Sequence, residues 1–224
     1  MPILRLEIQK SGAVSFLSHL DYVEALQRAL RRSGLPVAYS QGFNPHMKVS
    51  FGAALAVGVS SLGEWADVEI TRLVSENEVE TLLRPMLSES MGLRKYQILE
   101  EKPKALSNLI EAASYQAEWK SDADVGNFQQ ILSEVVARQE IPWEIISPKR
   151  RKIMDIRKEI VELLLNQENG KISLVFWLKL TPLGSLKPTI FLQYLESMGF
   201  LSFEKAQIIR TGLWRCVQGK WVKI

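Results

Sequence analysis

Cysteine and histidine are scarce in this chain of 224 residues, which contains one cysteine and two histidines. A single thiol cannot form an intrachain disulfide, a thiolate zinc site or the three-cysteine motif that holds an iron–sulfur cluster. Cys216 falls in an apolar stretch near the C-terminus, so we predict that it is a small core residue. His19, His46 and Asp21 lack the close spacing of a metal-ligand set. We therefore predict no bound metal and no cofactor.

Long apolar runs and nucleotide-binding motifs are also missing from the sequence. No apolar run reaches the roughly 18 residues that span a bilayer, and the first five residues, MPILR, lack the features of a secretory signal. We expect a cytoplasmic protein with no membrane partner. The sequence contains no G-x-x-x-x-G-K-[ST], G-x-G-x-x-G or H-E-x-x-H motif. These absences favour an accessory or binding protein over a stand-alone enzyme.

Net charge is small, at +3, and does not by itself indicate nucleic-acid binding. The distribution of the charge is more informative. Residues 149–152 form a run of four cations, the basic tetrad, and four adjacent cations cannot be buried without partners. We predict that residues 141–146 and 151–156 pair as a hairpin and that the basic segment is an exposed limb contacting phosphates. A solvated turn and docking to an acidic protein surface are the alternatives. The candidate nucleic-acid-binding residues are Lys149, Arg150, Arg151, Lys152 and Arg157.

Apolar periodicity divides the chain into two halves with a similar order of elements. In the first half, alternating segments at 3–8, 65–70 and 93–99 read as strands, and Ser18 and Ser75 open amphipathic helices. Two short extended segments flank the loop at residues 40–46. The order of strand, helix, two strands, helix and strand is that of a ferredoxin-like split βαβ unit.

The second half repeats this order after a connector at residues 102–112. Its predicted strands and helices lie at 114–119, 125–137, 160–165, 172–180, 188–198 and 207–216, with a turn at Asn169-Gly170. We therefore predict an α+β fold with two ferredoxin-like halves in tandem, at residues 1–101 and 113–224, each with its helices on one face of a sheet.

Polar residues gather at two junctions of the first half. If residues 37–39 form the second strand, the start of the first helix and the loop at 40–46 follow parallel strands and meet at one edge of the sheet. A helix N-terminus favours an anion, and histidine can serve as acid or base. Three interpretations of these residues stay open. They could bind a ligand or partner, they could have purely structural roles, or His19 and His46 could be weak catalytic candidates. The predicted ligand-binding or partner-binding residues are Ser18, His19, Asp21, Gln41, Asn44, His46 and Lys48.

Several stretches of the chain resemble one known family. These are FLSHLD at 16–21, ALRRSGLPVAYSQGFNPH at 29–46, SFG at 50–52 and EWAD at 64–67, followed by Arg151-Lys152 with Asp155-Ile156-Arg157. They resemble the radical SAM-associated family of unknown function. Its members are small separate proteins or the C-terminal part of a cobalamin-binding-type radical SAM protein. The resemblance is dense over residues 16–67 and departs from the family at Met47, where proline is usual.

The resemblance implies an accessory or adaptor protein that binds RNA or a translation-related substrate beside a radical SAM enzyme. The SAM and the cluster belong to the partner. Two rival interpretations remain. The first is a metal-independent endoribonuclease with His19 or His46 as acid–base group, by analogy with RNA-processing enzymes of similar fold. The second is a protein–protein interaction module that binds no nucleic acid.

Overall fold

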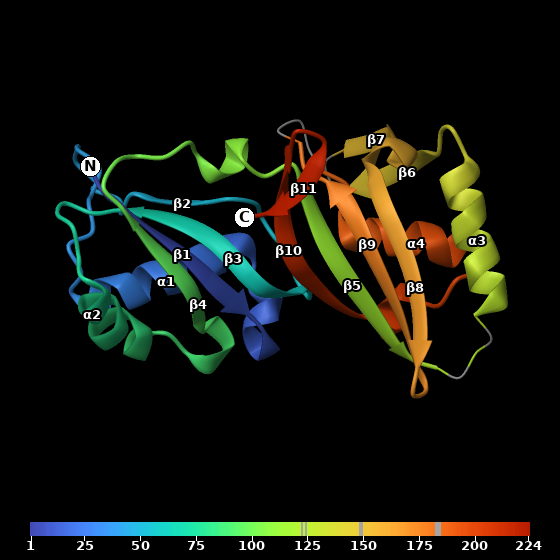
Figure 1. The fold of residues 1–224 in the computed structure, drawn as a ribbon, viewed down its shortest axis with the longest axis horizontal. Helices are drawn as coiled ribbons and strands as arrows, with labels where there is room; N and C mark the ends of the chain where they lie inside the picture. Colours follow the sequence, from blue (N-terminus) through green and yellow to red (C-terminus); the bar gives the residue numbers. More distant parts are fainter. Residues whose placement is uncertain (122, 124, 148–149, 182–184) are drawn as a thin grey trace. The chain divides into compact units, whose positions relative to one another are not determined.

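The chain folds into two compact units, Met1–Ile110 and Glu111–Ile224. The computed structural model describes residues 1–121, 123, 125–147, 150–181 and 185–224. Both units combine helices with antiparallel strands (Figure 1), which confirms the predicted α+β class. None of the described helices is long and apolar enough to cross a membrane.

The first unit is built on four antiparallel strands. Their order across the sheet is β4-β1-β3-β2, with β1 pairing both β3 and β4, and β2 pairing β3. The strands are β1 (Ile3–Lys10), β2 (Val49–Phe51), β3 (Ser60–Glu69) and β4 (Leu93–Leu99).

Helix α1 (His19–Ser33) follows β1 and covers one face of this sheet. Its start is fixed by Ser18, whose hydroxyl accepts the backbone N–H of Asp21 at 3.2 Å. Its end is fixed by Gly34, which adopts the left-handed conformation at φ 70°. Residues of its buried stripe, such as Tyr22 and Leu26, pack into the core formed with the inward side chains of β1.

A second helical segment begins at α2 (Glu76–Glu78) and continues through a π-helical turn, Val79–Leu83, to a 3₁₀ turn, Arg84–Met86. Ser75 and Glu78 form a capping box, as the sequence predicts. The segment ends at the turn that contains Pro85, because proline supplies no N–H to continue a helix.

Glu78 gives this helix start a measurable dependence on pH. Its carboxylate accepts hydrogen bonds from Arg72 at 2.7 Å and from the backbone N–H of Ser75 at 2.8 Å. The bond to Arg72 is the largest cause that lowers the pKa of Glu78 from 4.5 to about 2. We expect Glu78→Gln to lower the free energy of unfolding at neutral pH. A depressed carboxyl pKa stabilises the fold above the unfolded value and loses this effect as pH falls, so the gap should shrink between pH 4.5 and about 2.

Urea unfolding midpoints measured from pH 7 to pH 2 test this expectation. Glu76→Gln in the same turn is the matched control for removal of one negative charge. A gap between wild type and Glu78→Gln that stays constant over the whole pH range would contradict it.

The second unit has five antiparallel strands in the order β11-β10-β5-β9-β8. Two-residue turns join β8 to β9 at Asn169-Gly170 and β10 to β11 at Gln218-Gly219, and all four of these residues have positive φ. The first turn was predicted, whereas β11 was not. The strands are β5 (Ala112–Lys120), β8 (Ile160–Glu168), β9 (Lys171–Lys179), β10 (Gln207–Val217) and β11 (Lys220–Lys223).

The core of the second unit lies against the inward face of β9. Alternate residues Ile172, Leu174, Phe176 and Leu178 are fully buried, and the helices α3 (Gly126–Ala137) and α4 (Pro188–Ser197) supply further buried apolar side chains. Phe176 contacts Tyr115 of β5 and Phe191 of α4 at centroid distances of 5.4 and 5.1 Å.

Cys216 is not part of this core. It is exposed, so the prediction of a core cysteine is wrong. Cys216 lies near the end of β10, where this strand forms a ribbon with the short strand β11. There it pairs with Trp221. A two-stranded ribbon end has little to bury a side chain against.

A hairpin is inserted between α3 and β8. It consists of β6 (Pro142–Ser147) and β7 (Arg150–Asp155), paired from Pro142↔Asp155 to Ser147↔Arg150. This confirms the predicted pairing of the segments that flank the basic tetrad. Pro148 and Lys149, at the turn, lie outside the described residues.

Candidate functional site

The start of α1 holds three of the predicted site residues. The Ser18 hydroxyl lies 2.6 Å from Asp21 Oδ2 and caps the helix. The half-buried ring of His19 packs edge-on against Phe51, with centroids 5.5 Å apart at an interplanar angle of 82°. This arrangement gives Ser18 and Asp21 a role in capping and gives His19 a packing contact.

The loop at residues 40–46 is closed by its own ends. The N–H of Ser40 donates to the carbonyl of His46 at 2.8 Å, and the N–H of His46 donates to the Ser40 hydroxyl at 2.9 Å. Between them, Gln41 and Asn44 are exposed, as is His46 itself. These side chains are presented to solvent.

Lys48 lies just after this loop and pairs with Glu69 of β3 at 3.1 Å. Lys102 pairs with the other oxygen of the same carboxylate at 2.6 Å. These two cations, Lys102 first, lower the pKa of Glu69 against the opposing effect of its burial. Lys48 therefore holds β3 to the segment that enters β2.

The start of α1 and the loop at 40–46 lie at opposite ends of β1, so the expectation that they meet at one edge of the sheet is wrong. The Tyr22 hydroxyl of α1 donates to the carbonyl of Gln9, near the end of β1. The chain next to the loop instead bonds near the start of β1, where Ala38 donates to Glu69 and Ile70 donates to Pro2. Figure 1 shows this separation along β1.

The cause is the position of the second strand. Residues 37–39 form only isolated bridges, and the strand of the ladder is β2, which starts after the loop. Val49 of β2 lies level with Leu4 of β1, because both pair with Val68. The loop therefore precedes the second strand and lies at the end where β1 begins. A joint acid–base role of His19 and His46 has no support from this placement.

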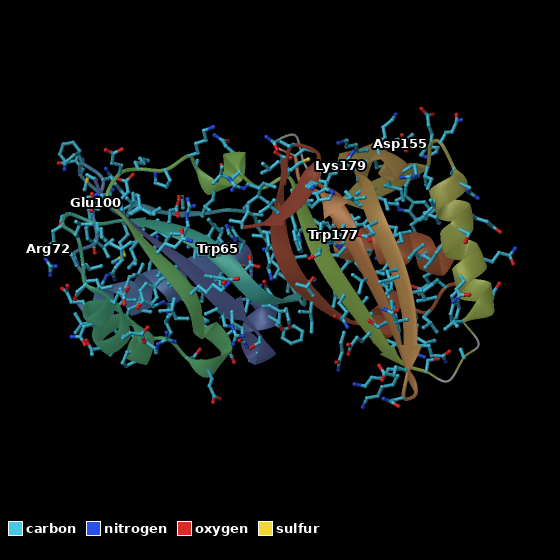
Figure 2. The ribbon with its side chains drawn as sticks, in the orientation of Figure 1. Trp65, Arg72, Glu100, Asp155, Trp177 and Lys179 are labelled. Carbon is cyan, nitrogen blue, oxygen red and sulfur yellow. The ribbon has the colours of Figure 1, made fainter. Side chains whose placement is uncertain are left out.

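The basic arm, which we define as the β6–β7 hairpin, is anchored at its base, and Arg151 and Lys152 of β7 are exposed. Asp155 Oδ1 accepts the N–H groups of Ile141 and Arg157 at 2.8 and 3.1 Å, and Trp143 packs edge-on against Tyr194 of α4 at 5.2 Å. The Ile141 bond and then Lys158, whose Nζ lies 2.9 Å from Oδ2, lower the pKa of Asp155. Figure 2 labels Asp155 at this base.

The cations of the arm differ in what they contact. The side chain of Arg151 is 75% exposed and reaches Glu144 only at 4.0 Å, and Lys152 is exposed. Lys149 lies outside the described residues, and the side chain of Arg150 is not described. Arg157 instead donates to the carbonyls of Val136, Arg138 and Ile160 at 3.1–3.4 Å. Arg157 thus serves to anchor the arm, while Arg151 and Lys152 extend into solvent.

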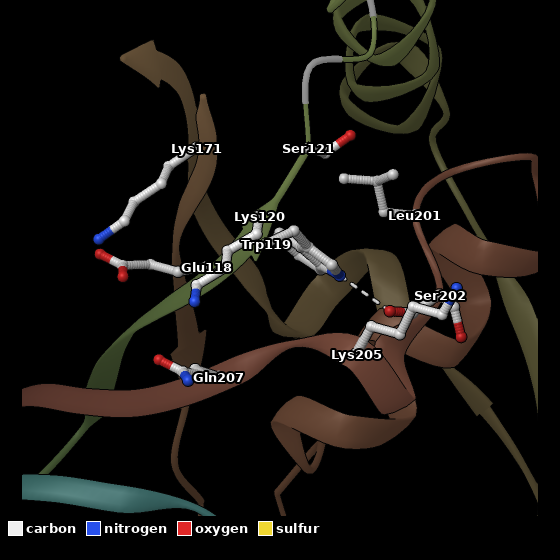
Figure 3. A pocket seen from close by; sticks show the side chains of 9 residues that line it. All are labelled: Glu118, Trp119, Lys120, Ser121, Lys171, Leu201, Ser202, Lys205 and Gln207. Carbon is white, nitrogen blue, oxygen red and sulfur yellow. Dashed lines mark hydrogen bonds between the residues drawn. The ribbon is translucent and has the colours of Figure 1, made fainter. Parts of the chain in front are cut away.

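A cavity of about 460 Å³ lies at the end of β5 in the same unit. Figure 3 shows Lys120, Lys171 and Lys205 around it. The Trp119 indole N–H donates to the Ser202 carbonyl at 2.8 Å and fixes one wall. Three lysines around one hollow suit an anionic group, although Glu118 also lines the cavity.

No pattern in the sequence indicates this cavity directly. Lys120 and Lys171 come together because they pair across β5 and β9, and Lys205 arrives from a distant turn. The strand register brings Lys120 and Lys171 to the cavity, and the turn Phe203–Lys205 adds Lys205.

A protein-family model matches residues 4–188 of the chain, and its description is "Uncharacterized protein conserved in bacteria (DUF2344)". The match spans most of the 224 residues. The chain belongs to the DUF2344 family. No curated protein matches it.

The DUF2344 match includes the whole first unit after residue 3 and, in the second unit, the basic arm. It ends at the first residue of α4, so Lys205 lies beyond it and Lys120 and Lys171 lie within it. In the part of the chain that the structure describes, no three His, Cys, Asp or Glu side chains are grouped as a metal site would need.

Proposed function

We propose that this DUF2344 protein is a cytoplasmic accessory protein that binds RNA and presents it to a radical SAM enzyme, without catalytic activity of its own. One observation carries the RNA-binding part. The basic arm is anchored at its base through Asp155 and Trp143, while Arg151 and Lys152 are exposed to solvent. An anchored base with exposed cations is suited to phosphate contact, because binding then orders few further side-chain and backbone groups.

The cavity with three lysines supports the same assignment. It places further positive charge on the second unit, and electrostatic attraction to a polyanion increases with the number of cations that reach phosphates. The radical SAM part rests on the sequence resemblance over residues 16–67 and not on the geometry of the described residues.

We also infer that both units are ferredoxin-like domains. The strand order β4-β1-β3-β2 of the first unit corresponds to β10-β5-β9-β8 in the second, in both cases fourth, first, third and second along the chain. In this interpretation the basic arm and β11 are additions to the second domain. Sheets of this class bind RNA in several unrelated proteins, which is an analogy of fold alone.

Ultraviolet crosslinking in a native extract tests the proposal. The full-length chain, carrying a tag, is irradiated, purified and analysed by mass spectrometry for RNA-linked peptides and for co-purifying proteins. We expect RNA adducts on peptides of the basic arm and recovery of a radical SAM protein. Adducts confined to residues 1–110, or no adducts, would contradict RNA binding by the arm. RNA adducts without a radical SAM protein would contradict the adaptor role alone.

A further inference from the structure

Three tryptophan side chains gather on one face of the sheet in the second unit. Trp177 of β9 and Trp214 of β10 stack with ring centroids 4.2 Å apart at 28°. Trp221 of β11 meets Trp177 edge-on at 6.1 Å. All three are half-buried. Because Phe176 and Leu178 occupy the core face of β9, Trp177 between them lies on the opposite face.

Local contacts fix this tryptophan face in place. The Trp214 indole N–H donates to the Ser114 hydroxyl at 2.9 Å, and Ser114 pairs directly with Trp177. Gly212 leaves the room that the rings need, since a Cβ there would lie 3.0 Å from Trp214 Nε1. The rings are therefore held in position before any ligand arrives, which reduces the entropic cost of binding.

Two lysines flank the tryptophan face. Lys179 follows Trp177 by two residues and so lies on the same side of β9 (Figure 2). Lys223 faces Trp214 across the ladder, so the two share a side. Arg215 and Lys220 are exposed on the same ribbon, but each is next in sequence to one of the tryptophans and so lies on the other side. Glu162 faces Trp177 from β8, and Glu111 lies beside Cys216, so acidic side chains are also present near Lys179 and Lys223.

The tryptophan face and the basic arm belong to the same unit. Lys179 of the face and Lys152 of the arm both lower the pKa of Glu159 against the larger, opposing effect of its burial. Each of these two cations therefore acts on the same carboxyl group.

We propose that Trp177, Trp214 and Trp221 form a platform on which bases of single-stranded RNA stack, while Lys179 and Lys223 contact the flanking phosphates. This inference rests on the proposed RNA binding and names the part of the RNA that the second unit recognises. Aromatic rings interleaved with cations are the usual means of holding unpaired bases, and they tolerate any base because every base has a stacking face.

Binding of two probes of equal charge tests the platform. One probe is a 12-nucleotide oligoadenylate, and the other is an abasic ribose-phosphate oligomer of the same length. We expect wild type to prefer oligoadenylate, and Trp221→Leu and Trp177→Leu each to weaken its binding about fivefold or more. Affinity for the abasic oligomer and the dependence on salt should stay unchanged. Trp221→Phe should retain most of the preference, because it keeps a ring.

Intrinsic fluorescence of the unmodified protein gives a second readout that needs no variant. Oligoadenylate should quench it, and the abasic oligomer should not. Equal affinity for the two probes without quenching, together with weaker binding when the arm cations are removed, would overturn the platform and leave RNA binding intact. Failure of both probes to bind would overturn the proposed function as well.

Discussion

Replacing Asp67 by Ala should destabilise the protein by about 3–5 kcal/mol, because it leaves the Arg5 guanidinium buried without its counter-ion. Arg5 of β1 and Asp67 of β3 pair directly across the ladder. The guanidinium donates to both carboxylate oxygens, at 2.7 and 2.9 Å, and both side chains are only 9% exposed. A bidentate pair in this setting is strong, and its loss is costly.

Urea unfolding followed by circular dichroism measures the effect of Asp67→Ala. Glu24→Ala is the matched control, because Glu24 pairs with Arg28 on the exposed face of α1, where both side chains are about 60% exposed. Removal of such a surface partner should cost about 0.5 kcal/mol or less. The double variant Arg5→Met/Asp67→Leu should recover most of the loss, since apolar residues can replace a buried ion pair. An Asp67→Ala protein as stable as Glu24→Ala would contradict this account.

The burial of Arg5 could not be predicted from the sequence. Charges at every second position of β1 suggest a strand with one wet face, yet Arg5 and Glu7 are buried. The alternation of apolar and charged residues predicts the strand and its two faces. It does not predict whether the charged face is buried. By contrast, the caps of α1 and the Asn169-Gly170 turn depend on local chemistry, and both were predicted correctly.

The candidate sites also differ in how far the sequence could predict them. The basic arm was predictable because its cations are adjacent in sequence and its flanking strands pair locally. The loop at 40–46 was misplaced because the extended pattern at residues 37–39 does not reveal that β2 begins only at Val49. The tryptophan face joins residues from different strands, and only the registers of β9 and β10 on β5, and of β11 on β10, bring them together.

Removing the cations of the basic arm should weaken RNA binding in a way that depends on salt. The variant changes Lys149, Arg150, Arg151 and Lys152 to Gln. Each contact between a cation and a single-stranded phosphate contributes about 0.7 to the slope of log affinity against log salt. If all four cations contact phosphates, the slope should therefore shrink by up to about 2.8. Affinity should fall most at low salt, where release of counter-ions favours binding most strongly.

The matched control removes four positive charges from the first unit, by changing Arg28, Arg31, Arg94 and Lys95 to Gln. These four side chains are exposed on α1 and β4. The control separates the effect of the arm from that of net charge, because both variants lower the net charge equally. Circular dichroism should confirm that both variants are folded.

The most direct test of RNA binding by the second unit is therefore the affinity of these three proteins for one single-stranded RNA across a salt series. We predict a reduced slope and weaker binding for the arm variant, with the control close to wild type. An arm variant that retains the affinity and slope of wild type would contradict the account and leave the basic arm as a solvated hairpin.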